Sequence, residues 1–407
     1  MEQAGARSGP LRSQPPRPAG CIQRENPIRY FLAKLADLVR LRRPAFSAGT
    51  TISARIQWRG RGAKILLSNG ESIFIRHRYR NIERPPTDDF AAFALAAVAQ
   101  SDGVTFRLEG TTSQSAVDSL RRLEDVFRDW GLLAADRHWI EVVRVVATPS
   151  PLPGKLMCLS GGMDSTYAAQ SDERREGAAA LLVAGADYRK LYGRGFREVE
   201  QRVGRIAHEL GLALEVVETD IRKFRLKWRL VHPMVLAACA HLLSRQYGNL
   251  AIAADFSLEQ ERTLGPWGNH SRVVPNLSGD AMTVRQRGEQ IARVGKYRQI
   301  VAAAPALIPV ITVCFKDKTQ GGNCGRCYKC LIHRTAIGIA GGDVSGVFRH
   351  MPDLATALLT LPVPADPVAG APQRLFDEDV MANLPADSPL VGVFRKRQEA
   401  RQRVTGA

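Results

Sequence analysis

The sequence predicts an α/β protein built on a doubly wound parallel sheet and preceded by a smaller α+β domain. Three observations indicate this. Apolar, strand-like runs alternate with helical patterns after residue 150, an antiparallel pattern comes before them, and a proline-rich stretch, ATPSPLPG at 147–154, separates the two. Strands that alternate with crossover helices favour a parallel sheet. With 407 residues and 45% apolar composition, the chain is long enough for two cores.

The N-terminal region is expected to form a disordered tail followed by the α+β domain at 21–150. Residues 1–20 are rich in arginine, glycine and proline and show no periodicity. Within 46–80, two alternating segments flank Asn69-Gly70, a pair typical of a hairpin turn. Apolar positions of helical period then predict two helices, at 88–100 and 115–130.

The second domain, at 151–345, is expected to contain a five-stranded sheet with helices between the strands. The strands are predicted at 155–160, 178–186, 213–220, 249–256 and 307–315. The helices are predicted at 163–170, 196–212, 234–247 and near 286–303. Ligands of such sheets bind beyond the carboxyl ends of the strands. The remaining residues, 346–407, are expected to be an appendage with one short helix.

A glycine turn follows the first of these strands in KLMCLSGGMDST, residues 155–166. Backbone N–H groups of such a turn can approach an anionic oxygen, and the positive end of the following helix attracts it. The turn lacks the Gly-Lys pair of a Walker A loop and the three glycines of a dinucleotide fold. The alternative is a purely structural strand-to-helix turn in which Asp164 is an acid at the helix start.

This stretch resembles the SGGxDS signature of the PP-loop ATP pyrophosphatase superfamily. The resemblance implies that a substrate oxygen attacks the α-phosphate of ATP and that pyrophosphate leaves. It also implies that the loop holds the pyrophosphate, that Asp164 helps to position Mg²⁺, and that Asp164 and Ser165 are catalytic. The loop residues implied in ATP binding are Ser160, Gly161, Gly162, Asp164 and Ser165. Asp255, at the end of the fourth strand, is a further candidate for nucleotide or substrate contact. The loop that follows Asp255 holds weaker candidates, namely His270, Arg272 and Asp280.

Four cysteines crowd into CFKDKTQGGNCGRCYKC, with the spacing C-x9-C-x2-C-x2-C. Four thiolates suit a closed, tetrahedral Zn²⁺ site, and such a site is structural. An iron–sulfur cluster is the alternative, although the Cys-Pro that usually completes ferredoxin-like runs is absent. The expected ligands are Cys314, Cys324, Cys327 and Cys330.

In this order, the two motifs resemble the QueC family of 7-cyano-7-deazaguanine synthases, over about half of the chain. The resemblance implies a ligase that activates 7-carboxy-7-deazaguanine with ATP and adds ammonia. Two segments that would flank the substrate depart from the family pattern, GADYRKLYGRGFRE at 185–198 and DFSLEQERTLGPWGNHSRVVPNLSGD at 255–280. The extra N-terminal domain is similar to that of longer QueC-like proteins in anti-phage operons such as the Qat system. That layout implies transfer of the deazapurine to a protein amine, with the basic N-terminal domain as the docking surface for the partner.

The charge of the chain is strongly positive, with 57 Lys and Arg against 40 Asp and Glu. Residues 21–86 alone hold fourteen basic and four acidic side chains, a field that attracts anions. Nucleic acid is therefore a second class of partner, and a tRNA-modifying sulfurtransferase or amidotransferase is the alternative enzyme. A non-catalytic nucleotide-binding scaffold in an immunity complex is the third hypothesis. No apolar run has the length of a membrane span and no secretory signal is visible, so a soluble, cytoplasmic protein is expected.

Overall fold

The computed structural model describes residues 46–147, 150–172, 177–189, 191–314 and 322–405, so the predicted tail at 1–20 lies outside the described residues. In the described part, ten strands form one sheet in the order β10-β9-β6-β7-β8-β3-β2-β1-β4-β5. The strands are β1 Thr51–Arg59, β2 Gly62–Leu67, β3 Ser72–His77, β4 Thr105–Ser113, β5 Ile140–Val146, β6 Lys155–Cys158, β7 Ala178–Ala184, β8 Ala213–Thr219, β9 Asn249–Ala253 and β10 Thr283–Arg287.

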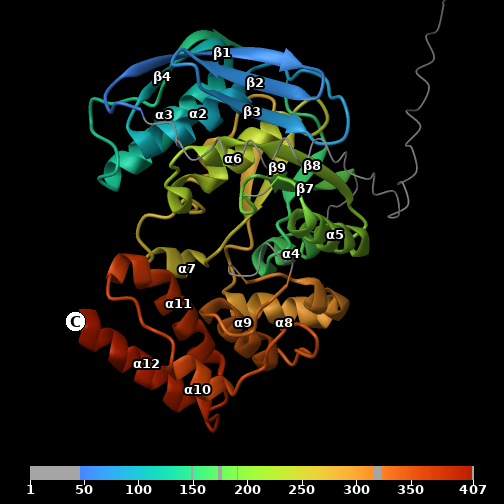
Figure 1. Cartoon of the computed structure of the whole chain (residues 1–407), viewed down its shortest axis with the longest axis vertical. Helices are drawn as coiled ribbons and strands as arrows, with labels where there is room; N and C mark the ends of the chain where they lie inside the picture. The colour runs from blue at the N-terminus through green and yellow to red at the C-terminus, as the bar shows by residue number, and fades with distance from the viewer. Residues whose placement is uncertain (1–45, 148–149, 173–176, 190, 315–321, 406–407) are drawn as a thin grey trace, which may run out of the picture.

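The mixed α/β architecture with a large, mostly parallel sheet is therefore confirmed. β6 to β10 run parallel to one another, whereas β1, β2 and β3 pair antiparallel. The predicted hairpin is also present, because Asn69-Gly70 lies between β2 and β3 and the Gly70 amide donates to Leu67 at 3.0 Å. Strands from both sides of the proline-rich stretch belong to this one sheet (Figure 1).

The prediction of a fifth strand at 307–315 is wrong. Residues Pro305–Val310 form a 3₁₀ helix, η3, because Pro305 and Pro309 have no backbone N–H to donate to a neighbouring strand. The fifth strand of the parallel part is β10, which lies at the edge of the sheet and pairs with β9. The chain thus runs from β6 through β7 to β8 and then returns to β9 on the other side of β6. That reversal is the topological switch point at which ligands of open α/β sheets bind.

The helices cover both faces of the sheet and extend beyond it at the C-terminal end (Figure 1). They are α2 Asp89–Asp102, α3 Gln114–Asp129, α4 Met163–Gln170, α5 Arg194–Glu209, α6 Trp228–His241, α7 Leu258–Glu261, α8 Arg293–Ala303, α9 Tyr328–Ile339, α10 Leu354–Leu359, α11 Pro367–Asn383 and α12 Leu390–Thr405, with two further 3₁₀ turns, η1 Ile221–Lys223 and η2 Val274–Leu277. No helix in the described ranges is both long and apolar enough to cross a membrane.

The expectation of one short helix at 346–407 is wrong, because α10, α11 and α12 all form there. The side chain of Asp366 caps α11 by accepting from two backbone amides, and Pro367 occupies the first helical position. Pro372 has no N–H to donate to the carbonyl of Val368, four residues earlier. Arg229 of α6 donates to that carbonyl instead, at 2.9 Å. The C-terminal helices are therefore tied to the rest of the molecule.

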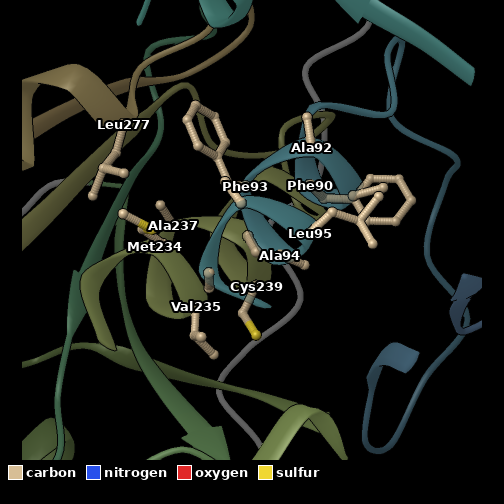
Figure 2. Close-up of a cluster of buried hydrophobic side chains, with 14 of the residues drawn as sticks. Phe90, Ala92, Phe93, Ala94, Leu95, Met234, Val235, Ala237, Cys239 and Leu277 are labelled. Atoms are coloured by element: carbon tan, nitrogen blue, oxygen red, sulfur yellow. The ribbon is translucent and has the colours of Figure 1, made fainter. Parts of the chain in front are cut away.

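The sheet separates two cores because successive side chains of a strand point to opposite faces. Leu156 of β6 belongs to the core that also contains α2, α3 and α6, while Met157 belongs to the core that contains α5, α8, α9 and α11. In the first core, alanines and other small residues let α2 and α6 lie close together, with Phe93 and Met234 between them (Figure 2). Residues before and after the proline-rich stretch thus share this core.

Buried ion pairs join β3 to β8, where the N-terminal strands meet the parallel strands. Glu218 of β8 is 3% exposed and binds Arg76 at 2.6 Å and Arg78 at 3.0 Å. Three residues earlier in the chain, Glu215 bonds His77 at 2.8 Å and Arg80 at 2.6 Å. Ion pairs therefore add to the antiparallel backbone pairing of β3 with β8 at this junction.

Replacing Glu218 with alanine is expected to lower the free energy of unfolding by about 3–5 kcal/mol, because Arg78 would be left as a buried cation without its carboxylate. Chemical denaturation followed by circular dichroism measures the loss. The matched control is Asp125→Ala, which removes a pair between Arg128 and a carboxylate that is 69% exposed and should cost less than about 1 kcal/mol. Equal losses in the two variants would contradict the importance of this junction.

Candidate functional site

The glycine loop connects β6 to α4 at the switch point of the sheet. Gly161 has a φ of +76°, a conformation that glycine adopts without strain, and Gly162 is the N-cap of α4. The hydroxyl of Ser165 accepts from the Ser160 amide at 3.2 Å and donates to the Gly162 carbonyl at 3.0 Å. The turn is therefore fixed by its own residues before any ligand binds.

Two segments distant in sequence hold this loop from outside. The Thr312 amide donates to the carbonyl of Gly161 at 2.7 Å, and the Tyr188 hydroxyl donates to the carbonyl of Ser160 at 3.1 Å. Thr312 belongs to the extended chain that leads to Cys314, so the loop and the cysteine cluster are connected through a few residues. Ser160, Gly161, Gly162 and Ser165 are therefore gathered in one place, as the sequence predicts for an anion-binding loop.

Asp164, in the first turn of α4, is paired with two cations of α8. Its carboxylate binds Arg293 at 2.8 Å and Lys296 at 3.0 Å, and these basic side chains are 6% and 1% exposed. Burial alone would raise the pKa of Asp164, but the charges of Arg293 and Lys296 outweigh it and lower that pKa. Lys296 also donates to the carbonyl of Ala254, at 2.6 Å.

Neither Arg293 nor Lys296 was predicted from the sequence. Both lie in a helix whose composition gives no motif, and only the fold brings them to the glycine loop. The Nε and Nη1 atoms of Arg293 are buried and have no hydrogen-bond partner among the described residues. These two atoms are covered by protein, so their unused donors are a cost to the fold and are not open to a ligand in this structure. The Arg293 side chain also lines the cavity described below, which makes it a candidate for ligand contact.

A cavity of about 580 Å³ opens beside the loop, at the carboxyl ends of β6, β7 and β9. This volume is in the range of sites for small organic ligands. Its polar end is lined by Ser160, Gly162, Asp164, Ser165, Arg293, Thr312, Lys329 and His333. The rest of its lining combines aromatic and apolar side chains, among them Trp228, Trp267, Phe256 and Phe376, with the charged residues Asp187, Arg229 and Asp255. The cavity can thus hold an anionic group and an apolar or aromatic group at once.

Asp255 follows β9 and lines this cavity together with the loop, so the sequence candidates Asp164, Ser165 and Asp255 share one pocket. The Asp255 carboxylate accepts from the indole N–H of Trp267 at 2.9 Å. Trp267 also packs edge-to-face on Phe256 and lies 5.1 Å from the guanidinium of Arg229. The sequence alone does not indicate that this tryptophan, in a long loop, contacts Asp255 and lines a pocket.

The C-terminal region supplies part of the wall, which the sequence did not indicate. Phe376 of α11 stacks on Phe256, with ring centroids 5.0 Å apart, and the guanidinium of Arg293 lies 3.6 Å from the Phe376 ring. The carboxylate of Asp379, one turn later, accepts from the Val294 amide at 3.0 Å. Helix α11 therefore holds the start of α8, where Arg293 lies.

The three weaker candidates in the loop after Asp255 do not line the cavity. His270 lies 3.4 Å from Glu261, Arg272 pairs with Asp129, and Asp280 accepts from the Ser115 amide at 3.1 Å. Arg272 and Asp280 join this loop to α3 of the N-terminal region. The structure therefore gives them contacts within the fold rather than a place in the pocket.

The four clustered cysteines meet at the start of α9. Their sulfurs all lie within 4.8 Å of one another, and the Cys314–Cys327 and Cys324–Cys330 pairs are each 3.8 Å apart. A tetrahedral ion with Zn–S bonds of about 2.3 Å requires sulfurs about 3.8 Å apart, so the thiols fit a zinc ion. Hydrogen bonding with Cys330 lowers the pKa of Cys327 to about 5, whereas the pKa of Cys330 is raised. The cluster could thus hold a metal such as zinc.

The four-cysteine cluster and the cavity are connected through α9. Lys329 and His333, which line the polar end, are on the same helix as Cys327, its N-cap, and Cys330. His333 is bonded to the hydroxyl of Tyr297 at 2.7 Å, and its burial, together with Arg293 and Lys329, lowers its pKa well below the ordinary value.

Comparison of the chain with protein-family profiles, with curated proteins and with solved structures found no match.

Proposed function

We propose that the protein is an ATP-dependent ligase that joins a carboxylic acid to an amine and forms AMP and pyrophosphate. The observation that carries the proposal is the glycine loop SGGMDS at the switch point, where it opens into a cavity whose polar end bears Arg293, Lys329 and His333. A preformed turn, a helix N-terminus and two cationic side chains are what a polyphosphate needs.

The reaction has two steps in this proposal. An oxygen of the substrate carboxylate attacks the α-phosphorus of ATP, and the bond to the bridging oxygen breaks, so that pyrophosphate leaves with the electron pair. An amine then attacks the acyl carbon, AMP leaves with its oxygen, and the amine loses a proton. The loop amides and Arg293 stabilise the charge that builds on the leaving pyrophosphate. The resemblance to the QueC family supports 7-carboxy-7-deazaguanine or a related deazapurine as the acid.

Asp164 and Asp255 differ in their availability to the Mg²⁺ that accompanies ATP. Mg²⁺ is held by one or two carboxylates together with phosphate oxygens and supplies positive charge to the phosphates. Both oxygens of Asp164 are engaged by Arg293 and Lys296, while Asp255 contacts the cavity and binds one indole. We therefore assign Asp255 to the ion, and Asp164 to the orientation of the two cations.

The amine acceptor is ammonia or a protein amine in this proposal. The aromatic part of the cavity, with Trp228 and Trp267, suits a planar heterocycle, whereas the polar end suits its activated carboxylate. The four-cysteine cluster has a structural role, because a site closed by four thiolates offers no position to a substrate.

The test is to incubate the protein with ATP, Mg²⁺ and 7-carboxy-7-deazaguanine, with and without ammonia, and to quantify AMP and pyrophosphate. We expect equal amounts of the two products, and only when the acid is present. Formation of ADP and phosphate would indicate a different reaction. Nucleotide binding without turnover would support the scaffold hypothesis instead, and no pyrophosphate with any deazapurine acid would contradict the ligase.

A further inference from the structure

His333 is the buried group at the polar end of the cavity to which the proposed reaction has so far given no role. It is 3% exposed and lies on α9, three residues after the metal-site residue Cys330. Its Nδ1 atom is bonded to the hydroxyl of Tyr297, a side chain of α8 with no exposed surface. One nitrogen of the ring is therefore fixed by a neighbouring helix, and the other is available.

The available nitrogen, Nε2, meets the cavity. His333 lines the cavity, and no other hydrogen bond of this residue exists in the described part of the chain. Nε2 is not one of the fully covered polar atoms that lack a hydrogen-bond partner, so this nitrogen has accessible surface. An imidazole nitrogen at a cavity wall either donates or accepts, depending on which nitrogen carries the proton.

The hydroxyl of Tyr297, which is bonded to Nδ1, decides which nitrogen of His333 carries the proton. Tyr297 is completely buried, and its hydroxyl has no other partner among the described residues. If His333 donated from Nδ1, the phenolic proton would be left without an acceptor in the core, which is costly. The phenol therefore donates to Nδ1, and the proton of the neutral imidazole is on Nε2, where it faces the cavity. The hydrogen positions follow from this satisfaction of donors and acceptors.

The groups around His333 show what kind of atom would accept this hydrogen bond. Arg293 and Lys329 are cations that line the cavity, and the loop presents the N-terminus of α4. The Asp164 carboxylate at this end is already paired with Arg293 and Lys296, and the remaining groups are mostly donors, so the ligand atoms expected here are acceptors. Burial keeps the hydrogen bonds strong, because water does not compete for them.

On these grounds we propose that His333 is a catalytic residue that donates a hydrogen bond from Nε2 to a phosphate oxygen in the transition state of ATP cleavage, with Tyr297 as the positioning residue that fixes the tautomer. This role rests on the proposed function. Neutral imidazole donors stabilise developing oxyanions in known enzymes. In this proposal the four-cysteine cluster also helps to position His333, because the cluster lies at the start of the helix that carries this residue.

The first experiment measures the kinetics of pyrophosphate formation in His333→Phe and His333→Gln. Loss of the donor in His333→Phe should lower kcat about 100-fold while the KM for ATP changes less than about threefold, because the hydrogen bond forms in the transition state. The glutamine variant keeps an N–H donor of similar reach and should recover a large part of the rate. The control is His241→Gln, which alters a buried histidine bonded to the Leu277 carbonyl in the other core and should leave kcat unchanged.

The second experiment reads the tautomer directly, by ¹⁵N NMR of histidine-labelled protein titrated with inorganic pyrophosphate. We expect the proton of His333 on Nε2, a shift of that signal on pyrophosphate addition, and a mixture of tautomers in Tyr297→Phe. A proton on Nδ1, or a wild-type kcat in His333→Phe, would overturn the inference and leave the ligase intact. Absence of pyrophosphate formation by the unaltered protein would overturn the proposed function together with the ligand assigned to His333.

Discussion

Replacing Cys330 with serine is expected to release one zinc per chain and to unfold the start of α9. The four sulfurs are spaced for a tetrahedral ion, and Cys330 is fully buried among them. A structural zinc site can contribute on the order of 10 kcal/mol to folding. Because Cys327 is the N-cap of α9, the loss should appear in Tyr328–Ile339 before it appears elsewhere. Elemental analysis gives the zinc content, and hydrogen exchange gives the protection of α9.

The control for this variant is Cys239→Ala. Cys239 is also completely buried, but it lies in α6, in the core on the other face of the sheet. Its replacement should leave the zinc content at one per chain and cost at most a modest loss of stability. Iron instead of zinc in the unaltered protein, with visible absorbance, would contradict the zinc assignment. Full zinc content in Cys330→Ser would show that the ion is not held by the four cysteines.

Replacing Asp164 with asparagine is expected to lower pyrophosphate formation at least 100-fold and to destabilise the protein by about 3 kcal/mol. The change removes the counter-charge of Arg293 and Lys296, which are almost fully buried. Without the carboxylate, the two cations have no fixed geometry beside the glycine loop, and charge stabilisation in the transition state depends on that geometry. Coupled-enzyme assays of pyrophosphate and thermal unfolding measure the two effects.

The pH dependence of stability gives an independent check of this ion pair. The pKa of Asp164 is lower in the folded chain than in the unfolded chain. The pair therefore stabilises the fold at pH values above the ordinary aspartate pKa of about 3.9, and this contribution disappears as the pH falls below it. Asp164→Asn should lack this component, so its stability should fall less steeply in acid than that of the unaltered protein.

A matched control lies at the other end of α4. Asp172 is also buried and binds Lys155 at 2.7 Å, but it does not line the cavity. Asp172→Asn should therefore cost stability and leave the rate of pyrophosphate formation unchanged once the protein is folded. Loss of activity in both variants would show that Asp164 acts only through the stability of α4. Wild-type activity in Asp164→Asn would show that the Asp164 carboxylate is not required for the reaction.

The elements that the sequence predicted well are those with strong local signals. Helix α4 was predicted with its exact bounds, and the apolar strand and the two glycines that precede it mark its start. The cysteine cluster was equally visible, because close spacing along the chain brings the thiols together with little help from the rest of the fold. Both features depend on neighbours in sequence.

The fifth strand shows where local signals mislead. The predicted segment is more apolar than β10, but its residues 307–310 belong to the 3₁₀ helix η3, and the apolar side chains of 307–314 pack in the core with the helices. β10 is TVRQR, in which buried residues alternate with less buried ones, as expected of a strand at the edge of a sheet. Apolar composition reports burial, whereas strand formation depends on available N–H donors and on a partner strand.

The cations at Asp164 and the wall formed by Phe376 could not have been predicted from one sequence. Arg293 lies 129 residues from Asp164 in the chain, and Phe376 lies in a region that contains proline and alanine and no recognisable motif. Their positions follow from how α8 and α11 pack on each other. Long-range contacts of this kind are a property of the whole fold.

The junction between β3 and β8 also affects how the chain reaches its native state. In this junction, 142 residues separate Arg76 from Glu218, so the two strands are synthesised far apart in time. Until β8 has left the ribosome, the hairpin formed by β2 and β3 has an unpaired edge with three basic residues at its end, Arg76, Arg78 and Arg80. Charged side chains discourage an exposed edge from pairing with another chain. The arginines that later bind Glu215 and Glu218 can thus protect the nascent chain from aggregation. This protection matters because a pairing between residues far apart in sequence forms slowly and leaves the edge exposed in the meantime.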